Sequence, residues 1–192
     1  MLDFEAELGT ATALVLVDLQ QGNFTDEEPR IHDGPGLLER AGQLLAWARE
    51  GDMPVIFVLN DGGEGAVDEL NTPGFDMHPS LEPLGGEPLI TKTTPDGFLE
   101  TRLQRALEEL QVGSLIVAGL QTEYCLDTTC RSAWRLGYDV TLVSDAHSTW
   151  DGEVLSAEQI IAHHNRILGG WFVALATTEE VLNGAYSALA EV

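Results

Sequence analysis

Six short apolar segments alternate with segments of helical periodicity along this 192-residue chain, and this alternation is its strongest constraint on the fold. The apolar segments have the length of buried strands and occupy residues 11–18, 55–59, 87–92, 114–118, 138–143 and 172–176. Helices are predicted at residues 36–50, 100–110, 125–137, 156–168 and 177–189. Strands that alternate with helices build a parallel sheet with helices on both faces. The pattern therefore predicts an α/β fold, and the length fits a single domain over residues 1–192.

One long segment, residues 62–86, has neither the alternation typical of strands nor the 3.6-residue period of helices. Glycine, proline and acidic residues dominate it. A loop of this length inside a compact domain is usually functional or disordered. We predict that it forms the rim of a pocket.

The formal net charge of −23 arises from 32 Asp and Glu against 9 Lys and Arg. Nucleic acids and anionic membranes bind positive surfaces, so neither is an expected partner. No apolar run is long enough to span a bilayer, and the acidic start of the chain lacks the basic region of a signal peptide. We therefore expect a cytoplasmic protein. The charge fits either general solubility or attraction of a cationic substrate.

The only two cysteines, Cys125 and Cys130, lie five residues apart on one predicted helix. Their side chains point in different directions there, so neither a disulfide nor a zinc site is expected. Cys125 follows a strand and a glycine turn and stands at a helix N-terminus. Such a position favours the nucleophilic thiolate. The alternative is a thiol packed in the core.

Three chemically useful side chains follow three of the predicted strands: Asp18, Lys92 and Cys125. In open α/β sheets, ligands bind at the carboxyl ends of strands beside a topological switch point. Asp18 can act as the base that takes the thiol proton, and Lys92 can stabilise both anions. The thiolate would attack a carbonyl, and water would hydrolyse the resulting thioester.

Three motifs carry a family resemblance that extends over nearly the whole chain: LVLVDLQQGNF, ITKTTPDGF and VAGLQTEYCLDTTCRSAWRLGYDVTLVSDAHST. The sequence resembles the isochorismatase-like cysteine hydrolases. The resemblance implies a three-layer α/β/α sandwich whose six-stranded parallel sheet has the order 3-2-1-4-5-6. It implies a catalytic triad of Asp18, Lys92 and Cys125. It also implies a cis peptide between Leu120 and Gln121, with the amides of Gln121 and Cys125 as the oxyanion hole.

Departures from the family pattern narrow the predicted activity. Nicotinamidases carry an Asp-x-His metal site where this chain reads Asn60-Asp61-Gly62-Gly63, so we expect no metal and no cofactor. The presence of Cys125 favours cleavage of a C–N bond over hydrolysis of a vinyl ether such as that of isochorismate. The segment SAEQIIAHHNRILGGWF resembles the subgroup that includes streptothricin hydrolase. We therefore predict a hydrolase of a small amide, lactam or ureido compound.

Other possibilities stay open at this stage. The resemblance implies a homodimer or larger homo-oligomer. A non-catalytic member of the fold would instead bind a small ligand or a protein. A redox protein would need Cys130 within disulfide reach of Cys125.

Five further residues are predicted to contact substrate because they flank the expected crevice: Gln20, Phe24, Tyr124, His147 and Trp150. Phe24 and Trp150 are predicted to form walls, because ligand pockets are mostly apolar. Gln20 would supply a polar contact. His147 is the only histidine near the carboxyl end of a strand, so a Cys–His dyad is the main alternative to the triad.

Overall fold

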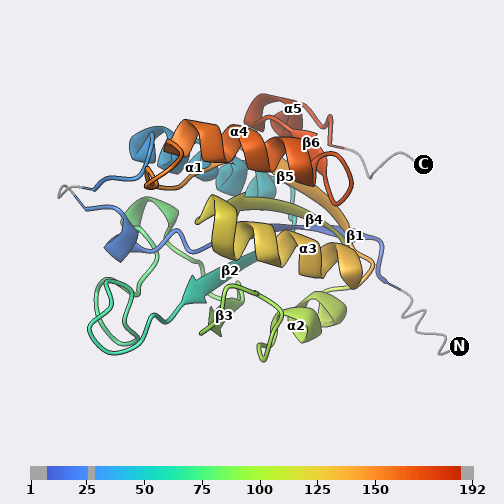
Figure 1. Ribbon diagram of the computed structural model, residues 1–192. Helices are drawn as coiled ribbons and strands as arrows, with labels where there is room; N and C mark the ends of the chain where they lie inside the picture. The colour runs from blue at the N-terminus through green and yellow to red at the C-terminus, as the bar shows by residue number, and fades with distance from the viewer. Residues whose placement is uncertain (1–7, 26–28, 187–192) are drawn as a thin grey trace, which may run out of the picture.

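The computed structural model describes residues 8–25 and 29–186 and contains one six-stranded sheet (Figure 1). The strands are β1 (Ala11–Val17), β2 (Val55–Asn60), β3 (Leu89–Lys92), β4 (Val112–Gly119), β5 (Asp139–His147) and β6 (Ala174–Ala176). All neighbouring strands are parallel, and their order is β3-β2-β1-β4-β5-β6. The predicted sheet and its strand order are confirmed.

Helices cover both faces of this sheet. They are α1 (Gly34–Glu50), α2 (Leu103–Glu109), α3 (Asp127–Arg135), α4 (Ala157–Leu168) and α5 (Thr178–Leu182). Helices α1 and α5 contribute to one apolar core, and α2, α3 and the end of α4 contribute to the other. In Figure 1, α3 lies in front of the strands and α1 behind them. No described helix combines the length and apolar character needed to cross a membrane.

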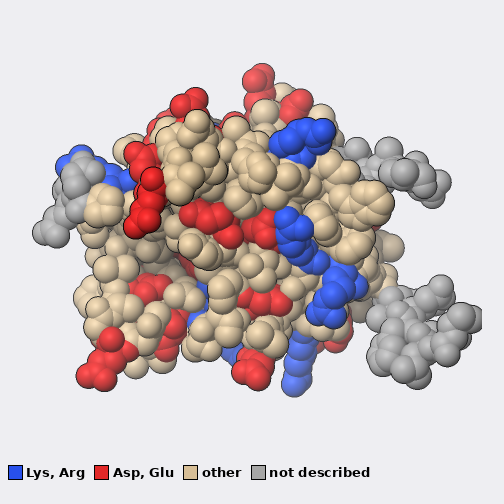
Figure 2. All heavy atoms as spheres, in the orientation of Figure 1, with Lys and Arg blue, Asp and Glu red and all other residues tan. Residues whose placement is uncertain are grey.

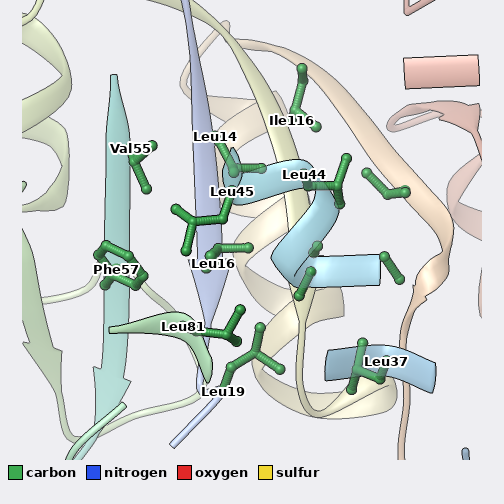
Figure 3. Close-up of a cluster of buried hydrophobic side chains, with 14 of the residues drawn as sticks. Leu14, Leu16, Leu19, Leu37, Leu44, Leu45, Val55, Phe57, Leu81 and Ile116 are labelled. Carbon is green, nitrogen blue, oxygen red and sulfur yellow. The ribbon is translucent and has the colours of Figure 1, made fainter. Parts of the chain in front are cut away.

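The central strand β1 shows why its sequence is an almost uninterrupted apolar run. Leu14 and Leu16 pack on the α1 side, where Figure 3 shows them beside Leu44 and Leu45. The alternate residue Val15 packs on the opposite side. A strand buried on both faces has no solvent-facing position, so its sequence does not alternate.

Several boundaries differ from the predicted ones. Strand β5 continues four residues beyond the prediction, to His147. The last helix starts at a capping box formed by Thr177 and Glu180 and ends at Leu182. The next turn contains Gly184 in a left-handed conformation, with φ of 77°, which ends a helix. The predicted continuation over residues 187–189 lies outside the described residues.

Acidic side chains are spread over the face shown in Figure 2, whereas most of the visible basic ones lie toward its right side. The acidic excess is therefore distributed over this face rather than concentrated at one opening. A distributed charge supports solubility and says little about one binding site.

Candidate active site

The structure brings together the three predicted catalytic side chains at the carboxyl edge of the sheet. Lys92 ends β3, Asp18 follows β1, and Cys125 follows β4. Lys92 Nζ lies 2.8 Å from Asp18 Oδ2 and donates to Cys125 Sγ at 3.1 Å. It also donates to Asn60 Oδ1 at 2.9 Å, so each of its three N–H bonds has an acceptor. Lys92 is the only lysine of the chain and is 1% exposed.

Asp18 is held at the turn that follows β1 by its own backbone. Its N–H donates to Val58 O at 2.8 Å, and its carbonyl accepts from Asn23 Nδ2 at 2.9 Å. Burial raises the pKa of the Asp18 carboxyl, and the Lys92 ammonium opposes that shift. Oδ1 is buried and has no hydrogen-bond partner among the described residues. That oxygen is therefore available to accept a proton.

Cys125 lies in a π-helical turn over Thr122–Leu126, directly before α3. The N–H of Leu126 donates to Gln121 O at 3.2 Å, a bond that spans five residues. Burial raises the pKa of the Cys125 thiol to about 12, the Asp18 carboxylate adds to the increase, and Lys92 opposes it. This increase favours the thiol, whereas the helix N-terminus favours the thiolate. Cys125 and Cys130 are both free thiols.

The turn before Cys125 begins with a glycine that the fold requires. Gly119 has a φ of 132°, and a Cβ there would lie 2.0 Å from Val17 O of the neighbouring strand. The next peptide bond, between Leu120 and Gln121, is cis. The N–H of Gln121 donates to no group among the described residues. This free donor is compatible with the predicted oxyanion hole.

A cavity of about 100 Å³ opens beside the three side chains. Its lining consists of Asp18, Asn23, Asn60, Asp68, Leu120, Gln121, Cys125 and Trp150. Trp150 is thus placed at the cavity, as predicted for a wall. Phe24 instead lines an adjoining cavity of about 230 Å³, and Asn23 borders both cavities. Phe24 therefore lines the neighbouring cavity and not the one that Asp18 and Cys125 line.

The other predicted contacts have different surroundings. Gln20 is fully buried, and its amide donates to Asn60 O at 2.8 Å and to Phe75 O at 3.0 Å. It also accepts from Asn60 N at 2.8 Å, so it joins β2 to the long loop. Tyr124 is 55% exposed and lines neither cavity.

His147 is not placed at the cavity. It is almost completely buried, and its ring nitrogens bond to Thr122 Oγ1 and Asn165 Oδ1, both at 2.9 Å. Burial lowers its pKa to about 4. These contacts join the end of β5 to the π-helical turn and to α4. This arrangement offers no geometric support for a Cys–His dyad.

Sequence reasoning missed three polar lining residues: Asn23, Asn60 and Asp68. Asn60 ends β2, between the strands that carry Asp18 and Lys92, so the rule of strand carboxyl ends could have found it. Asn23 lies close to Asp18 in the sequence and bonds to its backbone. Asp68 lies within the long loop, where no local pattern distinguishes it from the other acidic residues.

Comparisons with known proteins show which family this chain belongs to. A family model described as the isochorismatase domain matches residues 12–163. Streptothricin hydrolase from Streptomyces noursei is 39% identical over 139 residues, which are 72% of this chain and 50% of that protein. The chain thus spans about half the length of that relative. Ureidoacrylate amidohydrolase RutB from Variovorax paradoxus is 22% identical over 185 residues, which are 78% of this chain and 73% of that protein.

A solved structure of an isochorismatase family protein superimposes with a TM-score of 0.80 and 32% sequence identity. The match covers 86% of this chain and 98% of that chain. This structural similarity and the family model, which matches far more than half of the sequence, show that this chain belongs to the isochorismatase family.

Proposed function

We propose that this chain is a cofactor-free cysteine amidohydrolase that cleaves the C–N bond of a small amide, lactam or ureido compound through a thioester. One observation carries the proposal: Lys92 Nζ contacts both Asp18 Oδ2 and Cys125 Sγ beside a cavity. A thiol, a carboxylate with an unpaired oxygen and a fixed cation are the parts that nucleophilic acyl transfer needs. The names of the streptothricin hydrolase and ureidoacrylate amidohydrolase relatives support the same reaction class.

In the proposed reaction, Asp18 Oδ1 accepts the thiol proton while Cys125 Sγ attacks the carbonyl carbon. The raised pKa of Cys125 makes this coupling necessary, because the resting group is a thiol near neutral pH. The oxyanion would form beside the N–H groups of Gln121 and Cys125. Preorganised donors at that point usually give the largest single electrostatic contribution.

The C–N bond then breaks, and the leaving nitrogen takes the proton from Asp18. The thioester on Cys125 remains. A water molecule transfers a proton to Asp18 and adds to the thioester carbon, which releases the carboxylic acid. The proton returns to Sγ and restores the thiol. Throughout, Lys92 keeps its three bonds and fixes the distance between base and nucleophile.

Intact-mass measurement after acid quenching tests this proposal. Wild-type protein mixed with a panel of small amides and lactams should gain the mass of an acyl group and release the amine. Cys125→Ala should do neither. Hydrolysis of a confirmed substrate by Cys125→Ala at the wild-type rate would rule out the thioester route. A panel in which no compound acylates Cys125 or releases amine would favour the alternative, a non-catalytic protein that binds a small ligand or a partner.

A further inference from the structure

Asp68 brings a second carboxylate to the cavity of the triad. It comes from the long loop, is only 8% exposed, and lines the cavity together with Asp18 and Cys125. Its Oδ2 accepts from Asn60 Nδ2 at 2.7 Å. Its Oδ1 receives no hydrogen bond from any described residue. Unlike Asp18 Oδ1, this oxygen is not a fully buried unpaired atom, so solvent or a ligand can reach it.

The loop is shaped to admit this side chain. A Cβ at Gly62 would lie 2.4 Å from Asp68 Oδ1, so only glycine leaves room for the carboxylate. Asn60 fixes Asp68 from the other side, because its amide group donates to Asp68 while its carbonyl accepts from Lys92. Asp68 is thus positioned by the same residue that positions the triad lysine.

The formal charges at this cavity do not balance. Asp18 and Asp68 are acidic, and Lys92 is the one cation in contact with the group. The three N–H bonds of Lys92 are already used, so it cannot neutralise Asp68 as well. The remaining lining residues are uncharged side chains. Among the described residues, the cavity therefore has one carboxylate without a cationic partner, and a cationic ligand would offset its charge.

The two carboxylates have different roles available to them. Asp18 is paired with Lys92 and approaches Cys125, so it is suited to proton transfer. Asp68 contacts neither Lys92 nor Cys125 directly and is free to bind a ligand group. A volume of about 100 Å³ has room for roughly three waters, which matches one small nitrogen group.

We propose that Asp68 determines substrate specificity by accepting hydrogen bonds from a cationic nitrogen group, an ammonium, amidinium or guanidinium, close to the bond that is cleaved. The role in specificity rests on the proposed function, because that function defines the reaction. The binding of the cation does not depend on it. It explains why a buried carboxylate stands beside the triad with an open oxygen. It also narrows the substrate to amides that carry a positive charge within a few carbon atoms of the reacting carbonyl.

A protection experiment tests the binding without any turnover. The rate at which iodoacetamide alkylates Cys125 is measured at pH 9 by peptide mapping, with methylguanidinium chloride or the neutral analogue N-methylurea as competitor. Ionic strength is held constant with sodium chloride, because the acidic surface attracts all cations. Wild-type protein should be protected at about tenfold lower concentration by methylguanidinium than by N-methylurea. Equal protection by the two compounds would overturn the proposal.

Two variants assign the effect to this residue. Asp68→Asn keeps the size of the side chain and should remove the preference for methylguanidinium. Asp52→Asn removes one negative charge at an exposed turn and should retain it. A preference that persists in a folded Asp68→Asn protein would overturn the assignment. If that variant does not fold, the comparison of the two competitors on wild-type protein still decides whether the cavity prefers a cation.

Turnover separates this inference from the proposed function. The amide 4-aminobutyramide should be hydrolysed with a KM at least about tenfold below that of butyramide, and Asp68→Asn should raise the KM for the cationic amide while kcat changes less. Equal KM values for the two amides would overturn the specificity role. Protection by methylguanidinium without hydrolysis of any amide would instead support the binding inference and contradict the proposed function.

Discussion

Lys92 and Cys125 are in direct contact, at 3.1 Å between Nζ and Sγ, although two other strands separate the strands that carry them. The side chain of Lys92 reaches the thiol from the end of β3. Its partners Asn60 and Asp18 are the residues at those two strand ends. One buried cation thus joins the ends of four adjacent strands.

Replacing this cation should remove both activity and stability. In Lys92→Met, the Asp18 carboxylate keeps its burial but loses its partner, which should lower the free energy of unfolding by about 3 to 5 kcal/mol. Amide hydrolysis should fall by about three orders of magnitude or more, because members of a catalytic unit fail together. Urea denaturation and amine release measure the two effects.

The exposed ion pair between Arg105 and Glu109 supplies the control for that experiment. Arg105→Met removes a cation of the same chain but from a solvated pair, so neither stability nor activity should change measurably. If Lys92→Met unfolded at the same urea concentration as wild-type protein, the buried pair would not stabilise the fold.

The pKa of Cys125 predicts a specific pH profile for its alkylation. Because burial and Asp18 raise that pKa to about 12, the thiolate fraction should grow about tenfold per pH unit from pH 7 to pH 10, with no plateau. Asp18→Asn removes one cause of the increase. This variant should therefore react faster with iodoacetamide at every pH in that range. It should no longer hydrolyse amides, because it lacks the carboxylate that acts as the base.

Stopped alkylation with mass detection gives both profiles. A plateau below pH 9 in the wild-type protein would mean that Lys92 outweighs burial and Asp18, so that the resting group is a thiolate. Slower alkylation of Asp18→Asn would show that Asp18 activates the thiol at rest, rather than only during attack. Either result would change the first step of the proposed reaction.

The sequence predicted the sheet and the positions of the triad because both follow from local patterns. Asp18 comes directly after an apolar run, Lys92 ends one, and Cys125 follows one after a short turn. Parallel strands bring such ends to one edge of the sheet. To predict the contact between Lys92 and Cys125, only the strand order was needed in addition. That order came from the family resemblance.

The roles of Gln20 and His147 could not be predicted in this way. Both lie at or just after strand ends, where functional residues are often found. Their polar groups are instead bonded to residues distant in the sequence. Phe75 is 55 residues from Gln20, and Asn165 is 18 residues from His147. The open oxygen of Asp68 depends on the path of a loop that has no periodicity. The pKa of Cys125 depends on burial, which no sequence motif specifies.

His147 should make the stability of the protein depend on pH. Its pKa is about 4 in the folded protein and near 6.5 when unfolded, so below pH 6.5 the unfolded chain binds a proton that the folded chain does not. The stabilisation is complete above pH 6.5 and is lost as the pH falls toward 4. Between pH 6.5 and pH 5 the free energy of unfolding should decrease by about 2 kcal/mol from this residue alone.

Urea denaturation at several pH values isolates this contribution. His147→Gln should be less stable than wild-type protein at pH 7.5, because the bonds to Thr122 and Asn165 are altered, but its stability should fall less between pH 6.5 and pH 5. His163→Gln changes an exposed histidine and should keep the wild-type dependence. Identical pH dependence in all three proteins would contradict the assignment.

Gly119 should tolerate no side chain, because it holds the turn that leads to the nucleophile. In Gly119→Ala the new Cβ would meet Val17 O at 2.0 Å and adopt a φ of 132°, so the free energy of unfolding should fall by about 3 kcal/mol or more. Gly63→Ala is the matched control: its φ is also positive, at 81°, but no atom lies within 4 Å of the added Cβ, so the loss should be about 1 kcal/mol. Urea denaturation measures both. Equal losses would mean that backbone conformation alone, and not the approach of β1, selects glycine at this position.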